Sequence, residues 1–135
     1  MIKILIADDY PAMRQSLKQI ISTTSDMVVG GEAGNGQEAL DKVLTEDWDV
    51  ILLDINMPVK SGLEVLQELR HEYPKLPVLV LSMHPEEQYA VRVVKAGADG
   101  YMTKGRAAQE LISAIRKVYA GGKYVSSSLA EKLGV

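Results

Sequence analysis

The sequence predicts an α/β domain built on a parallel sheet with helices on both faces. Residues 50–53 and 78–81 are apolar at every position, which is typical of central parallel strands buried on both sides. Strand-like and helix-like segments alternate five times, as the crossover connections of a parallel sheet require. A chain of 135 residues has the size of one domain with a single core.

The first half of the chain contains two strand–helix units. Residues 2–7 are rich in β-branched side chains and predict the first strand. Pro11 suits a first helical turn, and the apolar spacing that follows predicts a helix to about Ser22. A weaker strand at 27–33 and a glycine turn precede a second helix, which is marked by Ala39, Leu40, Val43 and Leu44.

Three further units follow. The third strand ends at Asp54, and Ser61 with Glu64 three residues later forms a capping-box pattern that starts a third helix. The fourth strand, residues 78–82, ends at a hydroxyl. The remaining elements are a helix around Tyr89, Ala90, Val93 and Val94 that ends at Gly97, a strand at 100–103, and a helix from Leu111 to Tyr119 closed by Gly121 and Gly122.

Composition excludes several classes of function. The 15 Lys and Arg residues against 18 Asp and Glu give a formal charge of −3, so DNA or anionic-membrane binding by this chain alone is disfavoured. Cysteine is absent, which excludes thiol catalysis and disulfides and fits a cytoplasmic location. No apolar stretch approaches the length of a membrane span or a signal sequence, so we expect a soluble protein.

Polar side chains follow the apolar strands where each strand ends: Asp8, Asp9, Asp54, Ser82 and Lys104. The carboxyl ends of parallel strands meet at one edge of a sheet, so we expect these groups to converge there. Two like charges about 4 Å apart repel by about 1 kcal/mol in water and by about 4 kcal/mol at a dielectric of 20. Proton uptake or a hard divalent cation must offset this repulsion, and Mg²⁺ is the simpler proposal.

Each of these residues has an ordinary explanation when taken alone. Asp8 and Asp9 could cap the helix at Pro11, and Asp54 could be the N-cap of the next helix. Lys104 alone is most often a surface lysine, and Ser82 a turn hydroxyl. The full set, in order at four strand ends, favours a phosphoryl site instead.

These residues also carry a family resemblance. The pair Asp8–Asp9, Asp54 with Met57, Pro58 and Gly62, then Ser82, Tyr101 and Lys104 resemble the receiver domain of two-component response regulators. Stretches 9–14, 81–84 and 96–101 are similar to receivers of the NarL/FixJ (LuxR-type) family. The resemblance implies a three-layer, flavodoxin-like (βα)5 doubly wound sheet with strand order 2-1-3-4-5. It also implies a receiver over residues 1–121, while 122–135 resemble the start of an inter-domain linker with a short helix.

The resemblance implies roles for the acidic residues. Asp54 would accept a phosphoryl group from a histidine kinase. Asp9 and Asp54 would bind Mg²⁺ or Mn²⁺ directly, and Asp8 would do so directly or through water. The backbone carbonyl of Asn56 would complete the protein ligands.

The same resemblance implies a switch. Ser82 and Lys104 would hold phosphoryl oxygens, and Tyr101 would rotate inward as the Ser82 loop closes. The side chains of Asn56 and His84 would tune the rate of hydrolysis. Taken alone, Tyr101 would more often be a half-buried strand aromatic and His84 an exposed loop residue.

The leading hypothesis is therefore a signalling switch rather than an enzyme. Its implied partners are a cognate histidine kinase and, after phosphorylation, a second copy of the chain. DNA would be bound only through a helix-turn-helix domain that is absent here, so we expect a receiver excised from a longer regulator, with a natural stand-alone receiver as the other reading.

Two alternatives remain. One is an Mg²⁺-dependent phosphohydrolase with an Asp54 nucleophile, as in dehalogenase-like phosphatases, although those have an acid where this chain has Asn56. The other is a binding module independent of phosphorylation, or a flavodoxin-like nucleotide binder.

Overall fold

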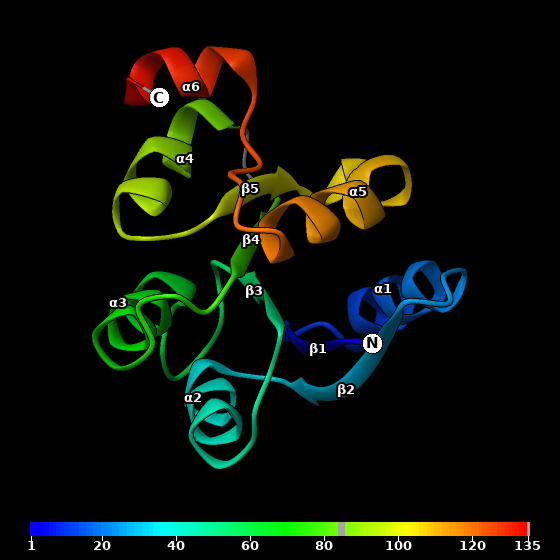
Figure 1. Ribbon diagram of the computed structural model, residues 1–135. Coiled ribbons are helices and arrows are strands. Elements are labelled where there is room, and N and C mark those ends of the chain that lie inside the picture. Colours follow the sequence, from blue (N-terminus) through cyan, green and yellow to red (C-terminus); the bar gives the residue numbers. More distant parts are fainter. Residues whose placement is uncertain (84–85, 135) are drawn as a thin grey trace.

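The computed structural model describes residues 1–83 and 86–134, with the backbone alone for 86–88. It contains one parallel sheet of order β2-β1-β3-β4-β5, as predicted (Figure 1). The strands are β1 (Ile2–Ala7), β2 (Met27–Ala33), β3 (Val50–Asp54), β4 (Val78–Ser82) and β5 (Gly100–Thr103). The helices are α1 (Pro11–Ser22), α2 (Gly36–Thr45), α3 (Gly62–Glu72), α4 (Glu86–Lys95), the 3₁₀ turn η1 (Lys104–Arg106), α5 (Ala107–Tyr119) and α6 (Ser127–Leu133).

Helices cover both faces of the sheet and create two hydrophobic cores. Helices α1 and α5 lie on one face, and α2, α3 and α4 lie on the other (Figure 1). Successive residues of β3 point to opposite faces: Ile51 and Leu53 enter the core beneath α2, α3 and α4, while Val50 and Leu52 enter the core beneath α1 and α5. Both faces are buried, which explains why the strand is apolar throughout.

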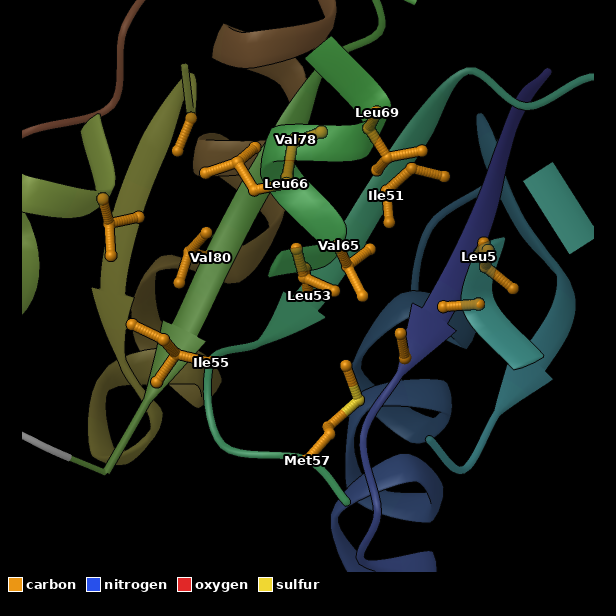
Figure 2. Packing of buried hydrophobic residues seen from close by; sticks show 14 of the residues in the cluster. Leu5, Ile51, Leu53, Ile55, Met57, Val65, Leu66, Leu69, Val78 and Val80 are labelled. Carbon is orange, nitrogen blue, oxygen red and sulfur yellow. The ribbon is translucent and has the colours of Figure 1, made fainter. Parts of the chain in front are cut away.

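The packing beneath α3 holds the carboxyl end of β3 in place. Leu53 of β3 lies beside Val65 of α3, and Ile55, just beyond the strand, belongs to the same buried core (Figure 2). Met57, in the loop that follows β3, reaches back toward β1 and is 9% exposed. The loop that leaves Asp54 is therefore anchored by buried apolar side chains on both sides.

Local signals in the sequence act as predicted. Ser61 and Glu64 form a complete capping box at the start of α3. Gly97 follows α4 with a φ of 116°, a left-handed conformation that strongly favours glycine. The second helix is observed where Ala39, Leu40, Val43 and Leu44 predicted it, and of these four residues Leu44, in the last turn of α2, is 58% exposed.

The C-terminal segment continues the fold beyond α5. Tyr124 forms a parallel bridge with Gly100 at the outer edge of β5, and its carbonyl accepts a hydrogen bond from the Tyr101 amide (3.1 Å). Helix α6 lies beside α4, and its Leu129 is 1% exposed within the core of that face (Figure 1). Within the described part of the chain, no helix combines the length and the apolar character needed to cross a membrane.

Candidate functional site at the carboxyl ends of the strands

Asp54 ends β3 and is 4% exposed. Its Oδ1 accepts a 3.3 Å hydrogen bond from the Asn56 amide, which turns the chain away from the sheet. The start of α3 packs directly on this turn, since the Gly62 amide donates to the carbonyl of Ile55 at 2.8 Å. A Cβ on Gly62 would lie 2.3 Å from the Asp54 carbonyl oxygen, so this close approach requires glycine.

Asp8 and Asp9 lie on the adjacent strand end, beyond β1. The Asp8 amide continues the ladder to the Ala33 carbonyl (3.0 Å), and its Oδ1 accepts a bond from the Tyr10 amide (2.9 Å). One carboxylate oxygen from each of Asp8, Asp9 and Asp54 lies within 4.8 Å of the others. The convergence predicted from the strand ends is thus observed for all three acids.

Lys104 is the cation of the site, and it is 9% exposed despite its length. It lies in η1, directly after β5, and not on the strand itself. Its Nζ is 2.8 Å from Asp8 Oδ2 and 3.4 Å from Asp54 Oδ2. Ser82 is fully buried and lies in register with Thr103, the residue before Lys104, so it also belongs to this edge of the sheet.

Burial and charge alter the protonation of both partners. Burial is the largest effect on Asp54 and raises its pKa to about 6; Lys104 opposes this increase, and Asp8 adds to it. Burial alone would lower the pKa of Lys104, but its contacts with Asp8 and Asp54 raise it above its usual value. The lysine therefore stays charged, while the site as a whole resists carrying three ionised carboxylates.

The donor set fits a hard divalent cation. Three carboxylates and one ammonium leave an excess of two negative charges when all are ionised. Asp9 Oδ1 is buried without a hydrogen-bond partner among the described residues, which is costly unless a further group binds there. Oxygen ligands at this spacing are those that Mg²⁺ and Mn²⁺ prefer.

The remaining predicted residues have different positions. Tyr101 is 3% exposed and lies inward, in the core beneath α4. Asn56 is exposed in the loop after β3. His84 lies outside the described residues, so its predicted role stays a prediction.

Two features of this edge of the sheet were not predicted from the sequence. The Arg14 guanidinium of α1 donates a 2.6 Å bond to the Asp8 carbonyl, and Glu32 of β2 holds the same guanidinium. Arg14 lies in the stretch 9–14 that carried the resemblance, but its tertiary contacts have no local signal. Val59 has a φ of 72°, unusual for a β-branched residue, and is 75% exposed beside the loop that carries Asp54.

A five-stranded doubly wound sheet with charged residues gathered at its carboxyl edge defines a flavodoxin-like α/β protein. The family model described as the response regulator receiver domain matches residues 4–116. The chain therefore belongs to the response regulator receiver family. Together with the relatives and the solved structure described next, this match confirms the predicted NarL/FixJ-type, two-component identity.

Known relatives support the assignment. The response regulator GacA of Pseudomonas syringae pv. syringae (strain B728a) is 35% identical over 135 residues, which cover 100% of this chain and 63% of GacA. The transcriptional regulatory protein DegU of Brevibacillus brevis is 38% identical over 132 residues, 98% of this chain and 56% of DegU. The chain thus spans less than two thirds of the length of these curated relatives.

A solved structure agrees with the fold. The crystal structure of a two-component response regulator of the LuxR family from Aurantimonas sp. SI85-9A1 matches with a TM-score of 0.89 and 27% identity. The match covers 98% of this chain and 94% of that chain. The similarity therefore extends through the C-terminal segment as well as the sheet.

Proposed function

We propose that Asp54 is the phosphoacceptor of a two-component signalling switch and receives its phosphoryl group from a histidine kinase. The observation that carries this proposal is the burial of Asp54 together with Asp8 and Lys104 at one edge of the sheet, where a carboxylate oxygen of the half-buried Asp9 also converges. In the reaction, an Asp54 carboxylate oxygen attacks phosphorus, the phosphorus–nitrogen bond of phosphohistidine breaks, and the imidazole leaves with the electron pair. The product is an acyl phosphate on Asp54.

The residues around Asp54 supply positioning and charge rather than covalent help. Asp9, Asp54, Asp8 and the Asn56 carbonyl would hold Mg²⁺ or Mn²⁺, which neutralises phosphoryl charge when bound. Lys104 would move its ammonium from Asp8 toward a phosphoryl oxygen, and the Ser82 hydroxyl would donate to another.

Phosphorylation would act on β5 and α4 through Tyr101. Its ring lies in the core beneath α4, and its amide bonds to the C-terminal segment. We propose that residues 1–121 act as the receiver and that 122–135 lead toward an output domain, with transcription as the output. A second copy of the chain, bound after phosphorylation, is the further proposed partner.

Turnover catalysis is the less favoured function. A dehalogenase-like phosphatase would need a second acid at Asn56, which offers an amide. Sustained hydrolysis of a phosphomonoester by the wild-type chain would favour that class instead. If the Asp54→Asn variant bound its partner as tightly as the wild type does, that result would favour a binding module independent of phosphorylation.

The direct test is incubation with Mg²⁺ and a small acyl phosphate, followed by intact-mass measurement. We expect one added phosphoryl group, removed by hydroxylamine, and none in Asp54→Ala. No mass increase in the wild type, or an increase that survives in Asp54→Ala, would overturn the proposal. Asp41→Ala, on the exposed face of α2, is the matched control.

A further inference from the structure

The turn that carries Asp9 is fixed at three points. The Asp8 amide bonds to Ala33 and its side chain bonds to the Tyr10 amide, so both are held by backbone. The third point is the Asp8 carbonyl, which accepts from Arg14 Nη1 at 2.6 Å. This carbonyl belongs to the peptide plane from which Asp9 departs, so holding it limits the direction of the Asp9 side chain.

Arg14 is itself held in place. Its Nε donates to Glu32 Oε1 at 3.0 Å, and its side chain is only 19% exposed. Lys18 binds the other oxygen of Glu32, also at 3.0 Å. Lys18 and then Arg14 keep the pKa of Glu32 below its usual value, so the anchor stays ionised at neutral pH.

We propose that Arg14, anchored by Glu32, is a positioning residue that aims Asp9 at Asp54 and thereby sets the affinity of the cation site. The inference rests on the proposed function, because it assigns a role toward the divalent cation proposed there. A planar guanidinium can bridge a carbonyl and a carboxylate with separate N–H groups, whereas a lysine ammonium is a single point charge. A lysine at position 14 would therefore keep the positive charge but could not hold both contacts in the same way.

The charge of Arg14 and its contact with Asp8 should affect cation affinity in opposite directions. Arg14 is a positive charge beside an acidic site, so removing its charge alone should strengthen cation binding. Losing its contact with the Asp8 carbonyl should weaken binding, by about tenfold if it behaves like other groups that orient metal ligands. Lys18 offers a matched control, because it pairs with the same Glu32 carboxylate but forms no hydrogen bond or ion pair with Asp8 in the described part of the chain.

The experiment measures Mg²⁺ and Mn²⁺ dissociation constants by calorimetry for the wild type, Arg14→Met, Arg14→Lys and Lys18→Met, with urea unfolding in the absence of metal. We expect the dissociation constant to rise about tenfold in Arg14→Met. It should rise in Arg14→Lys as well, despite the retained charge, and stay level or fall in Lys18→Met. If Arg14→Met does not fold, Arg14→Lys decides by the same criterion.

Other results overturn the inference. Unchanged or tighter binding in Arg14→Met, with only a lower urea midpoint, would show a purely structural role. Wild-type affinity in Arg14→Lys would show that charge alone matters. A wild-type chain that binds no divalent cation, and equals Asp9→Asn in this respect, would overturn the cation site of the proposed function and this inference together, whereas the first two results leave that site intact.

Discussion

The sheet has a cluster of charges at each end, and the two clusters are built on opposite principles. At the carboxyl ends, Asp8, Asp9 and Asp54 form the acidic cluster, and Lys104 forms ion pairs with Asp8 and Asp54. At the amino ends of β4 and β5, the arginine cluster is centred on Arg70. Its guanidinium donates to the carbonyls of Gly97, Tyr73 and Leu76 and to the carboxylate of Asp99.

The difference between them is one of pairing. Asp99 accepts from Arg70 Nη2 at 2.7 Å and from the Val78 amide at 2.9 Å, so both charges of the arginine cluster are compensated. In the acidic cluster, negative charge is in excess and Asp9 Oδ1 has no partner among the described residues. Compensated charges join elements together, while uncompensated ones prepare a site for a ligand at a cost in stability.

The largest expected effect is the loss of the arginine cluster. Arg70→Met removes the less exposed cationic partner of Asp99 and the donor to three carbonyls, and we expect it to lower the free energy of unfolding by about 3 kcal/mol. The measurement is urea unfolding, with Arg92→Met on the exposed side of α4 as the control. Mg²⁺ affinity should remain near that of the wild type. A loss below about 1 kcal/mol would contradict the comparison, since it would place the arginine cluster among weak surface pairs.

Removing a charge from the acidic cluster should have the opposite effect and raise the free energy of unfolding. The folded-state pKa of Asp54 is about 6, above that of an unfolded aspartate, so the folded state binds the proton more tightly. The stabilising contribution of that proton is complete below about pH 4 and is lost as the pH rises through about 6. Without Mg²⁺, Asp54→Asn should therefore be more stable than the wild type by about 2 kcal/mol at pH 8 and nearly equal to it near pH 4.

Urea unfolding of the two proteins between pH 4.5 and pH 8 tests this difference. A constant difference in the free energy of unfolding across the range would mean that ionisation of Asp54 is not the source of the electrostatic strain, that is, of the stability lost at high pH. A less stable Asp54→Asn at pH 8 would reverse the interpretation, because Lys104 would then gain more from Asp54 than burial costs.

Cation binding should remove part of that strain. At a free Mg²⁺ concentration ten times its dissociation constant, binding to the folded state alone stabilises it by about 1.4 kcal/mol. Asp9→Asn should lose most of this gain, because Asp9 contributes the buried oxygen without a partner. Urea unfolding at pH 8 with and without Mg²⁺ measures it, and Arg92→Met should keep the full gain. An equal gain in Asp9→Asn would place the cation elsewhere.

The same contrast separates what the sequence could predict from what it could not. Strands β3 and β4 were readable because burial on both faces leaves a continuous apolar run, and Asp54 and Ser82 stand where those runs stop. The site followed because parallel strands bring their carboxyl ends to one edge. The bond from Arg70 to Gly97 spans 27 positions and depends on the packing of α3, so no local pattern could indicate it.

The C-terminal segment shows the same limit. Residues 122–135 predict a linker with a short helix, and α6 lies within that stretch. The pairing of Tyr124 with β5 had no sequence signal, because one residue of edge bridge needs neither strand periodicity nor apolar content. The phenol of Tyr124 donates a hydrogen bond to Glu110 of α5. Burial is the largest cause that raises the pKa of Tyr124 to about 12, and the bond to Glu110 is the second. Such a contact joins elements that only the folded chain brings together.

The smallest expected effect tests where the arginine cluster ends. Lys123 Nζ lies 3.3 Å from Asp99 Oδ1, but its side chain is 51% exposed, against 16% for Arg70. Solvent screens such a pair, so Lys123→Ala should lower the free energy of unfolding by about 0.5 kcal/mol or less. Urea unfolding at low and high salt measures the change, which should vanish at high salt. A loss above about 1 kcal/mol at both salt concentrations would mean that Lys123 is needed to hold Tyr124 against β5, and the arginine cluster would then include the C-terminal segment.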